Sequence, residues 1–321
     1  MLTTDAACHR SLGPRNRLRG KAVVSLTAAS ASVFSLRFCR VSDVLINRCQ
    51  PQLMGIVNVT PDSFSDGHNG HFIDQAIAHA QVLLDEGADI LDIGGESTRP
   101  GAVPVPAHEE KCRVLPVIEA LAQMTQRTLS VDTSKPVVME AAVTAGARMI
   151  NDVRALRATG ALTVAAQLGV PVVLMHMQGD PATMQRAPTY NDVVSEVLDF
   201  IVQRIDTAVS AGIDFSRLII DPGFGFGKTS AHNFALLAAL ERFNRLNVPV
   251  LVGLSRKRSL GELTGRHAPK ARVFASVAAH LIAVQRGASI VRVHDVGATK
   301  DALQLWSAVQ VFDRLPADRH G

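Results

Sequence analysis

Eight short apolar runs alternate with helix-like stretches after residue 52, and this alternation constrains the fold more than any other feature. The runs are strand length and rich in β-branched residues, at 53–59, 89–94, 128–132, 148–152, 171–176, 217–221, 248–253 and 289–294. Helical patterns lie at 73–87, 107–124, 135–146, 160–168, 191–211, 231–246, 271–287 and 299–313. Glycines that suit helix ends follow at positions 87, 146, 169, 212 and 287. Strands that are apolar on both faces are typical of a buried parallel sheet.

Eight strand–helix units in ~260 residues match the count and length of an α/β TIM (β/α)8 barrel, with a doubly wound open sheet as the main alternative. The ends of the predicted strands favour the barrel, because polar side chains at eight strand ends meet at one mouth only if the sheet closes. These polar residues are Asn58, Thr60 and Asp62; Glu96 to Arg99; Asp132; Asn151 and Asp152; His176; Asp221; Ser255 to Lys257; and Arg292, His294 and Asp295. Helix capping explains the Asx and Ser side chains among them but not the Arg, Lys and His side chains.

The beginning of the chain differs from the rest. Residues 1–33 are rich in Arg, Ser and Ala, and we expect a disordered or targeting N-terminal extension there rather than a secretory signal. Residues 34–47 partly alternate and predict a short β-hairpin ahead of the barrel. Residues 34–321 are therefore expected to form a single catalytic (β/α)8 domain.

Composition excludes several classes of protein. No apolar run approaches the ~18 residues that a membrane helix needs, so no membrane partner is expected. The net charge of +4 comes from residues 1–50, which hold eight basic and two acidic side chains, so the barrel region is not a nucleic-acid surface. Four cysteines form no CxxC pair, which indicates a reduced cytoplasmic location.

Two groups of polar residues predict a binding site. Asp132 and Asp221 end apolar strands, and Asn151 lies at the end of a third, where a heterocycle with several N–H donors would satisfy their oxygens. The alternative for each is a structural cap or ion pair. The cluster 255–258 (SRKR) opens a helix at a strand end, and Arg292 and His294 share one strand face. Such basic and donor groups suit a phosphate or diphosphate.

Two other motifs are weaker. Residues 227–229 (GKT) resemble the end of a P-loop, but Pro222 stands where that motif requires Gly, so a nucleotide triphosphatase is rejected. The glycine-rich loop 223–227 could still bring backbone close to a ligand. His176 has no second ligand at metal-binding spacing, so we expect a buried core or pocket histidine.

Together these stretches resemble dihydropteroate synthases. The matching motifs are MGIVNVTPDSFSDG (54–67), DIGGESTRPGA (92–102), SVDTSKPVVM (130–139), INDV (150–153), LMHMQGDPATMQ (174–185), DPGFGFGK (221–228), VGLSRKR (252–258) and RVHDV (292–296). The resemblance covers all eight strand ends. It implies a folate-biosynthesis transferase that joins p-aminobenzoate to 6-hydroxymethyl-7,8-dihydropterin diphosphate, giving 7,8-dihydropteroate and diphosphate. It also implies a homodimer and a target of sulfonamides.

The resemblance implies roles for individual residues. The pterin would be held by Asp132, Asn151, Met175, Asp221, Phe226 and Lys257. The diphosphate would be held by Asn58, Thr98, Arg292 and His294, with Mg²⁺ at Asn58. The p-aminobenzoate site would comprise Thr98, Arg99, Pro100, Phe226, Ser255, Arg256, Lys257 and Arg258. The catalytic residues would be Asp132, Lys257, Arg292 and His294. Position 258 is often a small hydroxyl residue in this family, so Arg258 is a departure.

An arylamine is a neutral nucleophile, so cleavage of the C–O bond to diphosphate is the expected difficult step. Mg²⁺, Arg292 and His294 would stabilise the departing charge, and Asp132 would compensate the pterin-methylene cation. Two alternatives are carried forward. One is a methyltetrahydrofolate:corrinoid methyltransferase barrel, which has no need of a diphosphate cluster. The other is a non-catalytic pterin-binding paralogue.

Overall fold

Two short strands open the described part of the chain. The structure is a computed structural model that describes residues 38–41, 44–47, 50–60, 71–99 and 101–313. Strand β1 (Phe38–Val41) pairs antiparallel with β2 (Val44–Asn47), which confirms the predicted hairpin. Strand β1 lies against the 3-10 turn η3 (Phe215–Arg217), which leads into a barrel strand. The predicted extension at residues 1–33 lies outside the described residues.

Eight parallel strands of the described chain form the barrel. They are β3 (Gln52–Asn58), β4 (Ile90–Gly94), β5 (Thr128–Asp132), β6 (Met149–Asp152), β7 (Val172–Met175), β8 (Leu218–Asp221), β9 (Leu251–Val252) and β10 (Ile290–Val293). Their spatial order is β8-β7-β6-β5-β4-β3-β10-β9. The Ile220 N–H donates to the Pro249 carbonyl at 3.0 Å, and Ile220 bridges Val250 in parallel, so β8 and β9 meet. The predicted TIM barrel is confirmed, and the open sheet is wrong.

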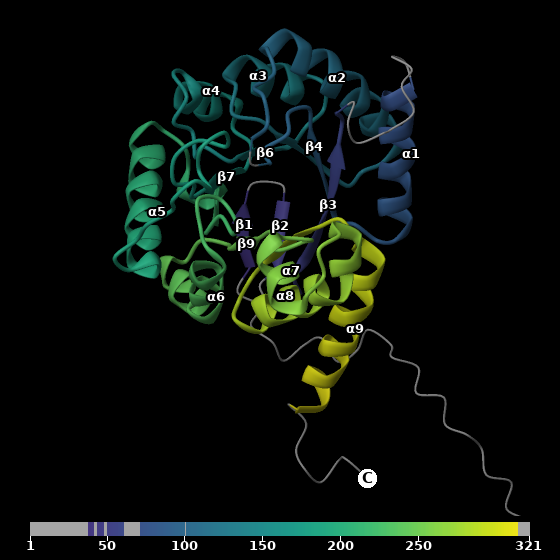
Figure 1. The fold of residues 1–321 in the computed structure, drawn as a ribbon. Helices are drawn as coiled ribbons and strands as arrows, with labels where there is room; N and C mark the ends of the chain where they lie inside the picture. The colour runs from purple at the N-terminus through teal and green to yellow at the C-terminus, as the bar shows by residue number, and fades with distance from the viewer. Residues whose placement is uncertain (1–37, 42–43, 48–49, 61–70, 100, 314–321) are drawn as a thin grey trace, which may run out of the picture. The chain divides into compact units, whose positions relative to one another are not determined.

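Helices surround the strands on the outside (Figure 1). They are α1 (His71–Asp85), α2 (Ala107–Met124), α3 (Pro136–Thr144), α4 (Ala161–Leu168), α5 (Val193–Ser210), α6 (Ser230–Ala238), α7 (Arg258–Thr264), α8 (Val273–Gln285) and α9 (Val296–Asp313). The 3-10 turn η4 (Leu240–Leu246) replaces the second half of the helix predicted at 231–246, whereas α8 confirms the helix predicted at 271–287 and the 3-10 turn η5 (Pro269–Arg272) leads into it. Helix α7 begins at Arg258, where the cluster 255–258 was expected to open a helix, but its seven residues are too few to show a helical period, so its extent was not predicted. The five glycines predicted at helix ends all have positive φ.

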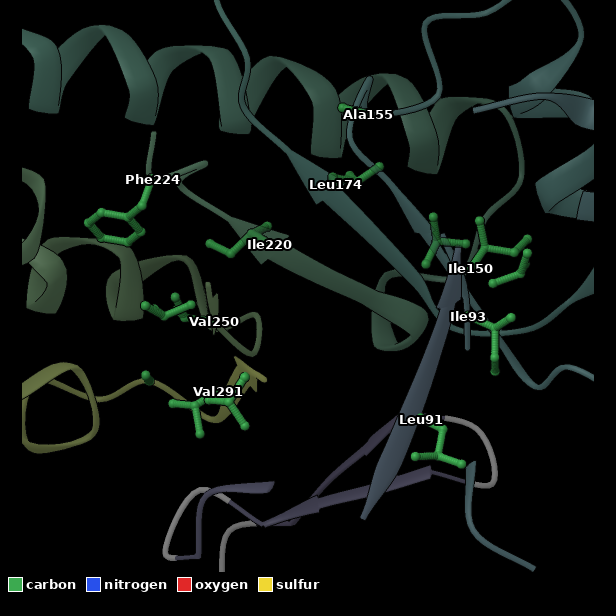
Figure 2. Packing of buried hydrophobic residues seen from close by; sticks show 14 of the residues in the cluster. Leu91, Ile93, Ile150, Ala155, Leu174, Ile220, Phe224, Val250 and Val291 are labelled. Carbon is green, nitrogen blue, oxygen red and sulfur yellow. The ribbon is translucent and has the colours of Figure 1, made fainter. Parts of the chain in front are cut away.

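The core has two parts, because side chains on a strand alternate between its faces. Outward-facing side chains pack against the helices in one large cluster, part of which Figure 2 shows from Leu91 to Val291. Inward-facing side chains form a smaller cluster inside the barrel, made by Met54, Ile90, Met149, Val173, Ile219, Leu251 and Ile290. Burial of each such side chain is worth about 1.5–3 kcal/mol. We call this inner cluster the apolar floor, since the site is built directly above it.

No helix within the described ranges is long and apolar enough to cross a bilayer.

Candidate active site

The charged part of the site lies one layer above the apolar floor. Two residues further along four of the strands, the side chain that faces inward again is polar: Asp92, Asn151, Asp221 and Arg292. Asp132 ends β5 and is paired in register with Asn151. The three carboxylates and the amide are all buried. The change from apolar to charged side chains toward the carboxyl ends therefore places a buried polar cluster where barrel active sites lie.

Arg292 joins this cluster into one hydrogen-bonded network. Its Nε donates to Asp92 Oδ2 at 2.6 Å, and its Nη2 donates to Asp132 Oδ2 at 2.9 Å. Asn151 Nδ2 donates to the same Asp92 oxygen at 2.8 Å. The guanidinium thus reaches from β10 past the intervening β3 to β4 and β5.

The charged groups in this network shift the pKa values of one another. Burial alone would lower the pKa of Arg292, but the Asp92 and Asp132 carboxylates outweigh it and raise the pKa. Burial raises the pKa of Asp132, with Arg292 opposing the shift and Asp92 adding to it. A buried pair of carboxylates that shares one guanidinium is poised to accept a second donor or positive charge.

Asp92 was missed by the sequence reasoning, which considered only residues at strand ends. Its signal was an acidic residue inside an otherwise apolar strand, ILDIG at 90–94. The side chain is fully buried, and Oδ1 has no hydrogen-bond partner among the described residues. A buried acidic oxygen of this kind indicates a binding role or a missing donor.

Asp221 and Lys257 form the second charged pair of the site. Asp221 Oδ1 accepts a hydrogen bond from the Gly223 N–H at 2.7 Å. Burial raises the pKa of Asp221 to about 6 and lowers the pKa of Lys257 to about 8. Lys257 Nζ lies 4.3 Å from the centroid of the Phe226 ring, which is a cation–π contact.

Apolar side chains adjoin these charges. Phe226 packs against a small cluster that contains Met175, Val153, Met177 and Met184. Met175 ends β7, where its side chain faces inward one layer above the floor. An aromatic ring and soft thioethers beside carboxylates match the two needs of a flat heterocycle, which are apolar contact with its faces and acceptors for its edge.

The glycine-rich loop after β8 is shaped by contacts within the protein. Gly223, Gly225 and Gly227 have φ of 71°, 79° and 63°. A Cβ at Gly223 would lie 1.8 Å from the carbonyl oxygen of His176, and one at Gly227 would lie 2.6 Å from the carbonyl oxygen of Gln178. The expected close approach is therefore made to protein backbone.

Lys228, from the same loop, acts as an internal support. Its Nζ donates to the carbonyls of Gly223 and Phe226 at 2.8 and 3.1 Å, and lies 2.8 Å from His176 Nδ1. His176 is buried, as expected, and its ring meets Phe200 edge-on with centroids 4.9 Å apart. Burial and Lys228 lower the pKa of His176, so the imidazole is neutral and accepts from Lys228. These contacts hold the backbone that presents Phe226.

Each of the predicted anion-binding residues His294, Arg256 and Arg258 has a partner within the protein. His294 Nδ1 lies 2.9 Å from Ser255 Oγ, and burial lowers the pKa of His294 to about 3, so the imidazole is neutral at pH 7. Arg256 is bidentate to Asp295, at 3.1 Å from Nε and 2.6 Å from Nη2. The guanidinium of Arg258 pairs instead with Glu262 on α7 at 2.7 Å, and its side chain is 87% exposed.

The remaining predicted residues lie at the rim. Asn58 ends β3, Gly94 is its register partner on β4, and Asp132 is the partner of Gly94 on β5. A Cβ at Gly94 would lie 3.4 Å from Asp132 Cβ and 3.7 Å from Asp132 Oδ2, so the Asp132 side chain lies against Gly94. Thr98 is half-buried and Arg99 exposed in the loop after β4. Arg99 adds to the lowering of the His294 pKa, and Pro100 lies outside the described residues.

Comparison with known proteins gives a consistent picture. Residues 54–294 match the family model described as pterin binding enzyme. The chain is 50% identical over 258 residues to dihydropteroate synthase of Escherichia coli K12, covering 80% of this chain and 91% of that protein. It is 61% identical to a structure of Xanthomonas albilineans dihydropteroate synthase with 4-aminobenzoic acid, at a TM-score of 0.80, covering 85% and 96% of the two chains. A structure of the Xanthomonas enzyme with 7,8-dihydropteroate is 58% identical over 85% and 97%, at a TM-score of 0.77.

Proposed function

The chain belongs to the pterin-binding enzyme family, and within it to the dihydropteroate synthases, and we propose from this premise how its residues act. The enzyme condenses p-aminobenzoate with 6-hydroxymethyl-7,8-dihydropterin diphosphate to give 7,8-dihydropteroate and diphosphate in folate biosynthesis. The observation that carries the proposal is the buried network of Asp92, Asn151, Asp132 and Arg292 above the apolar floor.

The pterin is recognised by acceptors and apolar contacts in the same layer. Asp132, Asn151 and Asp221 present side-chain oxygens to its ring N–H and amino donors, and burial strengthens each such hydrogen bond. Met175 and Phe226 contact the faces of the ring, and Lys257 donates to its polar edge from above Phe226. Because the pKa of Lys257 is lowered to about 8, its ammonium is mostly protonated at neutral pH and loses its proton just above it.

The diphosphate lies toward the rim, between Asn58 and His294. His294 is neutral, and Arg292 carries the positive charge at this side of the barrel. Thr98 adds a hydroxyl from the loop after β4. Release of Arg292 Nη2 from Asp132 lets the guanidinium bind the leaving group and frees Asp132 for the pterin.

The residues fit a lightly held Mg²⁺. No cluster of three or more His, Cys, Asp or Glu side chains suited to a metal occurs in the parts of the chain that the structure describes. Mg²⁺ in such sites is bound by one or two protein oxygens together with substrate phosphates, and the Asn58 amide oxygen is such a donor. When bound, the ion would neutralise charge on the diphosphate.

The chemical step is a substitution at the methylene carbon. The C–O bond breaks with its electron pair leaving on the diphosphate, the C–N bond to the arylamine forms, and the amine then loses a proton. Asp132 is assigned the role of stabilising positive charge on the pterin, and its burial, which also raises its pKa, strengthens attraction to a nearby cation. No side chain is needed as a strong base, since the arylamine is neutral at pH 7.

The p-aminobenzoate site is assigned to the rim on the side of β9 and the loop after β4. Thr98, Arg99 and Pro100 come from that loop, and Ser255 and Lys257 come from the segment after β9. Arg256 and Arg258 act less directly, because Arg256 is bound to Asp295 and Arg258 to Glu262. This proposal places the substrate carboxylate near backbone N–H groups at the start of α7.

A homodimer is also proposed. Large apolar side chains are exposed on helices α7 to α9, among them Leu263, Phe274 and Leu305 at 69%, 85% and 69% exposure. Light scattering on the purified protein tests this state: twice the chain mass supports it, and the mass of one chain contradicts it. A cytoplasmic location is proposed from the sparse cysteines, of which Cys112 is exposed and unpaired.

The experiment that tests the function is turnover with both substrates. Diphosphate and dihydropteroate should appear in equal amounts, and EDTA should abolish both until Mg²⁺ is restored. Pterin binding without either product would favour the non-catalytic paralogue. Transfer of a methyl group from methyltetrahydrofolate to a corrinoid protein would favour the other barrel family, which the presence of both Arg292 and His294 on one strand face argues against.

A further inference from the structure

A second charged cluster lies beside the site, outside the residues used above. Lys135 Nζ donates to a carboxylate oxygen of Glu96, in the loop after β4, and to one of Glu110, in α2. Glu110 is fully buried, whereas the side chains of Glu96 and Lys135 are 27% and 25% exposed. One ammonium therefore joins two carboxylates that come from different parts of the chain.

Stability alone is a poor reason for this arrangement. Buried ion pairs are costly to desolvate, and apolar replacements of equal volume are often as stable. Glu110 Oε1 also has no hydrogen-bond partner in the described part of the chain, which adds to the cost. Glu110 and Glu96 raise the pKa of Lys135 despite its burial, so the ammonium stays charged. A costly cluster of this kind suggests a role in fixing geometry.

The three residues differ in how firmly their backbones are held. Lys135 is the N-cap of α3, where its carbonyl accepts from the N–H groups of Val138 and Met139 at 2.9 and 3.0 Å. Glu110 lies within the first turn of α2. Glu96, by contrast, lies in a loop whose described residues, 96–99 and 101–106, form no helix or strand. The two helices therefore hold the loop, through Lys135.

The beginning of the loop packs closely onto the same helix. Arg113 Nη1, from α2, donates to the Gly95 carbonyl at 2.8 Å. A Cβ at Gly95 would lie 2.8 Å from a methyl carbon of Val114, so only glycine fits there without a shift. Thr98 and Arg99 follow Glu96 by two and three residues. The position of Glu96 thus determines where these two side chains begin.

We propose that Lys135, Glu96 and Glu110 form a positioning cluster that fixes the loop after β4 for p-aminobenzoate. The cluster also ties this loop to the segment that carries Asp132, three residues before Lys135, so that the pterin and arylamine sites keep a set distance. The inference rests on the proposed function. It assigns no contact with substrate to the three residues, which act through Thr98 and Arg99.

The variant that tests the cluster is Glu96→Gln, because it removes only the partner in the loop and leaves the buried Lys135–Glu110 pair intact. The ion pair between Lys135 and residue 96 becomes a weaker hydrogen bond from the ammonium to a neutral amide, so we expect the KM for p-aminobenzoate to rise about tenfold. The KM for the dihydropterin diphosphate and the thermal midpoint should stay close to wild type. The KM of Glu96→Asp for p-aminobenzoate should lie between those of wild type and Glu96→Gln.

Glu241→Gln is the matched control. Glu241 lies in η4, before β9, and the change removes the charge of an exposed carboxylate that pairs with Arg286. It should leave both KM values unchanged. Hydrogen exchange provides a readout independent of turnover: the backbone N–H groups of residues 96–99, 101 and 102 should exchange faster in Glu96→Gln than in wild type or the control.

Unchanged exchange and an unchanged KM for p-aminobenzoate would overturn the inference, as would an equal rise in both KM values. A fall in thermal midpoint alone would show a purely structural role and would also overturn it. Absence of dihydropteroate from the wild-type protein would instead contradict the proposed function, and the exchange measurement would still decide whether the cluster holds the loop.

Discussion

Replacing Asp221 with Asn should make the ligand-free protein more stable at neutral pH while reducing its activity. Burial raises the pKa of this carboxyl from 3.8 to about 6. A raised pKa means that the folded state prefers the protonated form, so stability present at low pH is lost as the pH rises through 6. The difference corresponds to about 3 kcal/mol above pH 6. The Asn side chain carries no charge and still accepts from the Gly223 N–H.

The pKa of about 6 already includes the opposing effects of the Gly223 N–H, Lys257 and Lys228, which all lower it. Part of the gain is offset because an Asn amide carries one more buried donor than a protonated carboxyl does. We therefore expect a net gain of about 1–3 kcal/mol, or a rise of roughly 3–8 °C in thermal midpoint. Urea denaturation at pH 7.5 and at pH 4.5 measures it, and the gain should shrink at the lower pH because the folded carboxyl is then protonated.

The matched control is Asp206→Asn, which changes an exposed Asp on α5 and should alter stability little. Turnover of Asp221→Asn should fall because an ionised acceptor for the pterin is lost. A variant that is less stable than wild type at pH 7.5, or that gains equally at both pH values, would refute the reasoning that burial of this charge opposes folding.

Three further outcomes are expected. Gly223→Ala should lower the free energy of unfolding by about 3 kcal/mol or more, since a Cβ there would lie 1.8 Å from the His176 carbonyl oxygen. Gly101 also has a positive φ, 82°, but nothing lies within 4 Å of its Cβ position, so Gly101→Ala should lower it by only about 1 kcal/mol. Urea denaturation measures both values. Arg292→Lys keeps the charge but loses the planar guanidinium from which Nε and Nη2 donate in fixed directions to Asp92 and Asp132, so the KM for dihydropterin diphosphate should rise tenfold or more in a diphosphate-release assay. Turnover should decline as the pH rises above about 8 because Lys257 loses its proton, and Lys257→Arg should lack that decline.

The sequence predicted the barrel well because its strands are short, apolar on both faces and ended by polar residues. Strand β9 shows where this signal weakens. Residues 248–253 are continuously apolar, yet only Leu251 and Val252 form regular ladder pairs. The Ile220 N–H donates to the Pro249 carbonyl on the β8 side, and the Ser289 and Ile290 N–H groups donate to the Val250 carbonyl on the β10 side, in place of a longer regular ladder. Hydropathy reports burial, and it does not report which backbone groups pair.

The candidate site was predicted in outline, and its pairings were not. Motif matching placed Asp132 and Arg292 in separate pterin and diphosphate groups, whereas the ligand-free protein joins them directly. Asp92, which accepts the hydrogen bond from Arg292 Nε, lies inside a strand, and no polar residue beside it in the sequence indicates a site there. The basic run at 255–258 looked uniform, but a partner 39 residues away holds Arg256. Such long-range pairs are set by the closed barrel, so a local pattern cannot contain them.

The central claim is that the carboxylate of Asp132 stabilises positive charge on the pterin as diphosphate leaves. Diphosphate release by Asp132→Asn under saturating substrates tests this claim most directly, with pterin binding and thermal midpoint measured beside it. The account predicts turnover reduced by about a hundredfold or more, with the fold retained and binding weakened far less. Turnover equal to that of the wild-type protein would contradict it.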